Sequence, residues 1–209
     1  SACLVGSEMC IRDRLSPDEL EERYADQYPE WLERVSRVAE RAAKACLYYN
    51  DGPAYTPCCR VSSGVTDDGG FTYLPALKLS RDPDSPEYSA SSEYTCTAVR
   101  KLLAPVTGSV VLPADKAEWF SEPQYTKNGT LRCIRFGGVE LTGEQLREAL
   151  GLRSAAVAIT QEHDSFIFRT RGSGGGVGMS VYTADLMARS GLSAQEILQQ
   201  FYPGTELID

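Results

Sequence analysis

Three segments of the chain carry the same signal for the start of a helix, and this signal constrains the fold more than any other feature. Each segment places a Ser or Thr three residues before a Glu or Gln, in Ser16–Glu19, Thr142–Gln145 and Ser193–Glu196. Such a pair forms a capping box, and the apolar residue before each box is placed to pack against the first turn of the helix. We therefore expect helices to begin near residues 16, 142 and 193, and the folded region to begin near Leu15.

The segments between these helix starts have the patterns of β-hairpins. Strand pairs are expected at 46–49 with 54–59, within 131–141 around a Gly-Gly turn, and at 155–160 with 165–170. Because strands and helices do not alternate regularly, the pattern predicts an α+β fold rather than a parallel sheet. The expected architecture is a single mixed domain in which antiparallel hairpins pack against short capped helices.

Two further helices and one loop complete this prediction. Trp31, Val35, Val38 and Ala42 share one helix face that needs a core partner, and a short helix is expected at 96–103. The segment 80–87 contains two prolines, which disfavour helix, so it is expected to be a surface loop.

The charge balance and the cysteine spacing exclude several functions. Asp and Glu outnumber Lys and Arg by 29 to 21, giving a formal net charge of −8, so a nucleic-acid partner is not expected. No apolar stretch approaches the ~18–20 residues that span a bilayer, and no export signal is expected in this chain. The seven cysteines form no C-x-x-C pair and His163 is the sole histidine, so no metal site of the usual zinc spacing is predicted.

A glycine-rich loop at 171–180 is the first candidate for chemistry. It follows a predicted strand and precedes a predicted helix, where backbone N–H groups can cradle an anion. It has neither the Gly-Lys-Ser/Thr ending of a P-loop nor the third glycine of the dinucleotide motif. The alternative is a tight reversal in which glycines let two backbones pack closely.

Other candidate groups have simpler interpretations as well. Cys58-Cys59 can supply a nucleophile only if His163 activates it, and buried or incidental thiols are the simpler interpretation. We interpret two acidic pairs, Asp67-Asp68 and Glu162/Asp164, first as solvated charges on loops and only second as catalytic groups. Trp31 and Trp119-Phe120 can stack on a sugar, although packing in the core is their commoner role.

The order and spacing of several motifs resemble the stage II sporulation protein D and amidase enhancer family. The specific part comprises LTGEQLREALGLR at 141–153, RGSGGGVGMS at 171–180 and EILQQFYPGTEL at 196–207. LSPDELEER at 15–23 and SSGVTD at 62–67 resemble upstream parts of the same domain. The resemblance thus extends from Leu15 to the end of the chain.

This resemblance implies action on peptidoglycan during sporulation and cell-wall remodelling. Family members resemble lytic transglycosylases that cleave denuded glycan strands with a single glutamate, which acts first as acid and then as base while a sugar hydroxyl attacks. The implied partners are glycan strands and a cell-wall amidase. The implied location is extracytoplasmic, at the cell envelope or the forespore septum.

The resemblance also implies which parts of the family this chain lacks. The catalytic glutamate and a Cys/His zinc-binding loop of the family lie N-terminal to the segment that matches from Leu15. We therefore expect no catalytic residue and no cofactor in this chain, and we expect 15–209 to be a domain without its N-terminal catalytic segment. Residues 1–14 are interpreted as non-native, because Glu8–Arg14 can be back-translated to a nucleotide sequence that resembles a transposase end used in preparing sequencing libraries.

Two hypotheses follow for the part that remains. One is a fragment of a cell-wall enzyme that still binds glycan, and the other is a non-catalytic glycan-binding or amidase-activating protein. Both hypotheses take account of departures from the family pattern: Ser173, Gly175, Val181 and Thr183 stand where the family usually has Tyr, His, Gln and Gly, and Cys59 stands where an active-cleft histidine is common. The loss of an imidazole and a phenol removes hydrogen-bonding groups from the expected sugar cleft. The predicted substrate-binding residues are Arg171, Gly172, Gly174, Gly176, Gly178, Ser180, Ser62 and Ser63.

Overall fold

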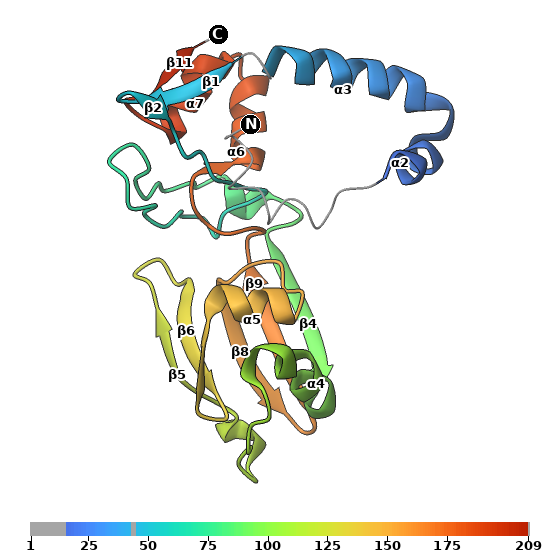
Figure 1. The fold of residues 1–209 in the computed structure, drawn as a ribbon, viewed down its shortest axis with the longest axis vertical. Coiled ribbons are helices and arrows are strands. Elements are labelled where there is room, and N and C mark those ends of the chain that lie inside the picture. The colour runs from blue at the N-terminus through green and yellow to red at the C-terminus, as the bar shows by residue number, and fades with distance from the viewer. Residues whose placement is uncertain (1–15, 43–44, 209) are drawn as a thin grey trace.

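The predicted capping boxes are present at the starts of three helices. In each box the Ser or Thr oxygen accepts a hydrogen bond from the backbone three residues on, at 3.2 Å from Glu19, 3.1 Å from Gln145 and 3.3 Å from Glu196. The structure, a computed structural model, describes residues 16–42 and 45–208 (Figure 1). Its helices are α2 (Pro17–Tyr24), α3 (Tyr28–Ala42), α4 (Cys96–Thr107), α5 (Gly143–Ala149), α6 (Val181–Arg189) and α7 (Ala194–Phe201), with short turns η2 (Ala25–Gln27), η3 (Asp82–Asp84) and η4 (Lys116–Glu118).

The strands form small sheets that are mostly antiparallel, which confirms the α+β class. Their sheet orders are β11-β1-β2, β10-β3, β4-β9-β8 and β5-β6-β7. The strands are β1 (Cys46–Tyr49), β2 (Gly52–Pro53), β3 (Cys58–Cys59), β4 (Ser89–Thr95), β5 (Phe120–Tyr125), β6 (Leu131–Phe136), β7 (Val139–Thr142), β8 (Val157–Glu162), β9 (Ser165–Arg171), β10 (Met179–Ser180) and β11 (Glu206–Ile208). The predicted hairpins of 131–141 and 155–170 are β6-β7 and β8-β9.

The larger hydrophobic core lies in the lower half of Figure 1, where two sheets pack with α4 and α5. Alternation along β9 sends Phe166 and Phe168 into this core, and both are almost fully buried. The opposite face of the same strand carries Ile167, Arg169 and Arg171. This alternation gives the sheet β4-β9-β8 one buried face and one polar face.

A second core lies in the upper half, beneath α6 and α7. Phe201, Tyr202 and Leu74 are its most buried members. The Tyr202 hydroxyl donates to the Pro57 carbonyl at 2.7 Å, so this core is tied to the segment that leads into β3. The pairing of β1 with β11 brings the C-terminal strand onto the same core.

Two predicted boundaries were wrong, and a predicted surface loop contains a fully buried residue. Of residues 54–59 only Ala54 bonds to β1, its N–H donating to the Leu47 carbonyl at 2.7 Å, because β2 closes the hairpin at Gly52–Pro53 and β3 instead pairs in parallel with β10. The helix predicted at 96–103 continues to Thr107, and Gly108 ends it in a left-handed conformation with φ of 67°. The expected surface loop 80–87 contains Asp82, which is fully buried.

The apolar face of α3 has few partners among the described residues. Trp31 stacks on Tyr24 with ring centroids 4.7 Å apart, whereas Val35 and Val38 are 42% and 66% exposed. The core partner that the sequence predicts for this face is therefore not found in residues 16–42 and 45–208. In the same part of the chain, no helix combines the length and the apolar character needed to cross a membrane.

Close packing at the start of α5 gives a test of this fold. A Cβ at Gly143 would lie 1.9 Å from the Leu131 carbonyl oxygen, whereas a Cβ at Gly52 would meet nothing within 4 Å. We expect Gly143→Ala to lower the free energy of unfolding by about 1–3 kcal/mol because the backbone of β6 must move. Gly52→Ala is the matched control and should change it little. Urea titration measures both, and equal values for the two variants would contradict the packing described.

Candidate functional site

The glycine-rich loop after β9 runs between segments of the chain that are distant in sequence. The Ser173 carbonyl accepts hydrogen bonds from the backbone N–H groups of Arg60 at 2.9 Å and Val61 at 3.2 Å. Within the loop, the N–H of Gly172 donates to the Tyr88 carbonyl at 2.6 Å and that of Gly174 donates to the Arg153 carbonyl at 2.8 Å. These N–H groups therefore form hydrogen bonds to carbonyl groups of the protein itself.

Steric contacts explain why glycine occupies this loop. Gly172 has a φ of 79°, and a Cβ there would lie 2.7 Å from the Ser62 carbonyl carbon. At Gly178 a Cβ would lie 1.9 Å from the Pro57 carbonyl oxygen. The geometry favours the interpretation of the loop as a close-packing segment, and a role of Gly172, Gly174, Gly176 and Gly178 in sugar binding stays a prediction.

A buried carboxylate that the sequence analysis missed organises this region. Asp82 accepts a hydrogen bond from the Ser62 backbone N–H on Oδ2 at 2.7 Å. On Oδ1 it accepts from the hydroxyls of Ser180, at 2.9 Å, and Thr183. Asp82 therefore joins three segments of the chain, because it binds the loop at Ser62 and the start of α6 from within η3. The sequence Arg-Asp-Pro-Asp offers no signal that separates Asp82 from the exposed Asp84.

The structure places the predicted serines around this carboxylate. Ser62 and Ser180 have no exposed surface, and the Ser62 hydroxyl also accepts from the Gly64 N–H at 3.1 Å. The Ser63 hydroxyl donates to the Val65 carbonyl at 3.2 Å. Ser62 and Ser180 thus act through Asp82, and direct contact of these serines with a ligand stays a prediction that the geometry does not support.

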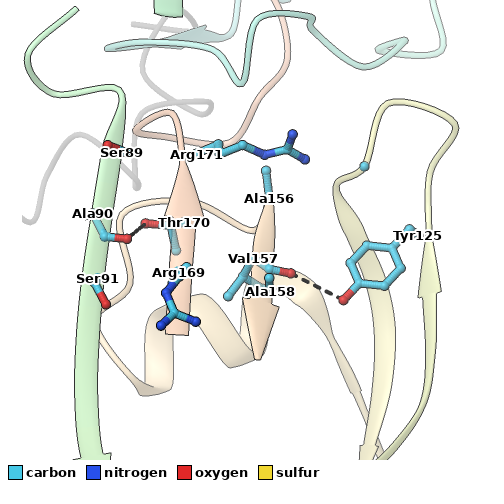
Figure 2. A pocket seen from close by; sticks show the side chains of 11 residues that line it. Ser89, Ala90, Ser91, Tyr125, Ala156, Val157, Ala158, Arg169, Thr170 and Arg171 are labelled. Carbon is cyan, nitrogen blue, oxygen red and sulfur yellow. Dashed lines mark hydrogen bonds between the residues drawn. The ribbon is translucent and has the colours of Figure 1, made fainter. Parts of the chain in front are cut away.

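Arg171 lies apart from these serines, at the rim of a groove of about 600 Å³. Figure 2 shows the groove between β4, β9 and β8 and the hairpin that carries Tyr125. The Tyr125 hydroxyl donates to the Val157 carbonyl at 3.3 Å, and burial raises the pKa of this phenol. The lining residues are Ser89, Ala90, Ser91, Tyr125, Gly129, Ala156, Val157, Ala158, Arg169, Thr170 and Arg171. The groove therefore offers hydroxyls, two guanidinium groups and one aromatic ring.

The candidate nucleophile and its base do not come together. Cys59 is 3% exposed, and burial followed by the nearby charge of Asp82 raises the pKa of its thiol to about 12. Since the thiolate is the reactive form, this thiol is inert near neutral pH. His163 lies in the turn between β8 and β9, at the opposite end of β9 from the glycine loop. Among the described residues, no group of three His, Cys, Asp or Glu side chains is placed to hold a metal ion.

The acidic loop pairs are occupied by local interactions. Asp164 forms an ion pair with Lys116 at 2.5 Å, and this hydrogen bond lowers the pKa of the carboxyl. Asp67 accepts from the Asn128 amide at 3.0 Å, and Asp68 accepts from the Gly70 N–H at 2.7 Å. These contacts support the interpretation of both pairs as loop charges.

Comparison with known proteins identifies two relatives. The chain is 28% identical over 199 residues to stage II sporulation protein D of Bacillus subtilis (strain 168), and 26% identical over 199 residues to the protein of the same name from Bacillus amyloliquefaciens. Each match covers 92% of this chain and 56% of the relative, so the chain spans little more than half the length of these relatives. No family model matches the chain. Both relatives carry the name of the family that the glycine motif and its neighbours predicted.

The burial of Asp82 gives a test with a control in the same turn. Asp82→Ala leaves three buried donors without an acceptor, so we expect it to lower the free energy of unfolding by at least about 2 kcal/mol. Asp84 makes only an exposed ion pair with Arg81, at 2.9 Å, so Asp84→Ala should change it by less than about 0.5 kcal/mol. Chemical denaturation measures the difference, and similar losses in the two variants would contradict the role given to Asp82.

Proposed function

We propose that the chain is a member of the stage II sporulation protein D family, as its similarity to two proteins of that name supports, that it acts on peptidoglycan during sporulation, and that it binds glycan strands in the groove beside Arg171. The observation that carries this proposal is the groove itself. It combines an exposed arginine, serine hydroxyls and the ring of Tyr125 along one sheet face. Hydroxyl, guanidinium and aromatic groups together suit a saccharide, which presents hydroxyls, carbonyls and apolar ring faces.

The described residues supply binding rather than acid–base chemistry in this proposal. A lytic transglycosylase needs a carboxyl group that reaches the glycosidic oxygen as acid and then as base. Asp82 has no exposed surface and both of its oxygens accept internal hydrogen bonds, so it cannot reach a substrate. The catalytic glutamate expected from the family is assigned to no described residue, and residues 1–14, interpreted as non-native, lie outside the described part.

The location, the partner and the cofactor of the protein are proposed from the family alone. We place the protein outside the cytoplasm, at the cell envelope or forespore septum, with a cell-wall amidase as a partner. We propose no cofactor for this chain, because the zinc-binding loop that the resemblance implies belongs upstream of the segment that matches from Leu15.

A non-catalytic role is the second candidate, and Cys59 favours it. This residue stands where the family commonly has an active-cleft histidine, and its buried thiol with a pKa of about 12 cannot take over proton transfer. A protein of this kind would bind glycan or activate an amidase without cleaving the strand. The two candidates share the groove and differ in whether the full-length protein cleaves the strand.

Retention on glycan tests the shared part of the proposal. We expect immobilised denuded glycan strands to retain the purified chain, and Arg171→Ala to weaken retention about tenfold, as loss of a charge-assisted hydrogen bond does. Arg100→Ala, an exposed change on α4 away from the groove, is the matched control and should bind as the parent does. Unchanged retention of the Arg171 variant would remove this residue from the binding site.

Product analysis tests whether this chain cleaves glycan on its own. The purified 209-residue chain should release no anhydro-saccharides from denuded glycan strands, because no Asp or Glu is among the residues that line the groove. Chromatography of the soluble products measures this release. Turnover that is abolished by Glu8→Gln would overturn both this expectation and the interpretation of residues 1–14 as non-native.

A further inference from the structure

The polar face of the sheet β4-β9-β8 carries the same arrangement of side chains at two positions. Arg171 pairs with Ser89 across β4, and Arg169 pairs with Ser91 in the same register. On the other side, Arg169 pairs with Ala158 in β8. The Arg171 N–H donates to the Ala156 carbonyl at 3.0 Å, which places Ala156 beside Arg171. Each arginine thus stands between a serine and an alanine.

The small neighbours leave both guanidinium groups open to the groove. Ser89, Ser91 and Ala158 are exposed, as are both arginines, and all five line the groove. Figure 2 shows the Arg171 side chain reaching from β9 over Ala156 toward the hairpin that carries Tyr125. Residues two apart on a strand lie about 6.5–7 Å apart, so the two arginines form a short basic row along β9.

These two arginines lack the acidic partners that six other described arginines have, and they differ from the remaining unpaired arginines in lining one groove together. Six arginines form ion pairs with Asp or Glu at 2.6–3.3 Å, namely Arg37, Arg60, Arg81, Arg135, Arg147 and Arg189. Within residues 16–42 and 45–208, no carboxylate forms an ion pair with Arg169 or Arg171. Arg169 donates from Nη1 to the Thr160 hydroxyl at 3.2 Å, which leaves most of its donors available.

The surrounding charge makes this arrangement informative. The chain has eight more acidic than basic residues, and other exposed arginines such as Arg23 and Arg100 also form no ion pair among the described residues, but only Arg169 and Arg171 bring two unpaired guanidinium groups together in the lining of this groove. A guanidinium presents a planar fork of donors that matches a carboxylate, and Lys does not offer this geometry. A ligand that carries carboxylate groups would therefore supply the acidic partners that these two guanidinium groups lack.

We propose that the face formed by Arg169, Arg171, Ser89 and Ser91 recognises the carboxylate groups of an acidic saccharide chain. The inference rests on the proposed function, since in denuded glycan the carboxylates are those of the sugar units and not of peptides. The guanidinium groups hold the carboxylate, the serines donate to sugar oxygens, and Tyr125 borders the ring. Arg169 is the residue that this inference adds, because sequence analysis selected only Arg171.

A chemically matched pair of ligands tests the proposal. Denuded glycan strands with free carboxylates are compared with the same strands after their carboxyl groups are converted to neutral methylamides. We expect the parent chain to bind the free form at least tenfold more tightly than the amide form, and a rise in salt to weaken only the free form. Arg169→Gln should reduce binding of the free form about tenfold and leave the amide form unchanged. Arg169→Lys, which keeps the charge and loses the fork, should fall between the parent and Arg169→Gln.

The controls separate this inference from the proposed function. Arg100→Gln changes an exposed arginine on α4 and should keep the full preference for the free form. Thermal unfolding should match the parent for all three variants, because the altered side chains are exposed. Equal binding of the two strand forms by the parent would overturn carboxylate recognition while glycan binding stands. Binding of neither form would overturn the proposed function and this inference with it.

Discussion

The buried carboxylate of Asp82 is the interaction on which the region around the glycine loop depends. A carboxylate without solvent contact is costly to bury unless donors replace its water. Asp82 finds them in the Ser62 backbone N–H and the hydroxyls of Ser180 and Thr183. These donors come from two parts of the sequence distant from Asp82, so the charge is satisfied only when all three segments are in place. The requirement ties the packing of the loop after β9 to the folding of α6 and η3.

Local signals in the sequence predict the elements of this fold well. The capping boxes at Ser16, Thr142 and Ser193 and the hairpin β8-β9 depend on residues close together in the chain, and each was correctly predicted. The parallel pairing of β3 with β10 joins Cys58 to Met179, more than a hundred residues away. No local pattern encodes such a contact, and residues 54–59 therefore resembled the partner of β1.

Less of the candidate site than of the fold could be predicted from the sequence, because the site also depends on contacts between distant segments. The glycine motif draws attention to Arg171, Ser180 and their neighbours, but it does not distinguish a glycine that binds a ligand from one that lets a backbone pass. Only the approach of Gly172 to Ser62 and of Gly178 to Pro57 makes that distinction. Arg169 was missed because strand alternation marks it merely as a solvent-facing residue. The role proposed for Arg169 rests on its small neighbours and on the groove that it lines together with Arg171.

The buried network and the open groove meet at the end of β9. Arg171 is the last residue of that strand, and Gly172 after it donates to the Tyr88 carbonyl, one residue before Ser89 of β4. Ser173 then pairs with Val61, which precedes the Ser62 that Asp82 binds. The position of Arg171 over the groove is therefore fixed from both sides, by the sheet register on one and by the Asp82 network on the other. In the proposed binding of glycan, the glycines and serines of the motif contribute through this geometry, because they hold in place the strand that carries the arginines.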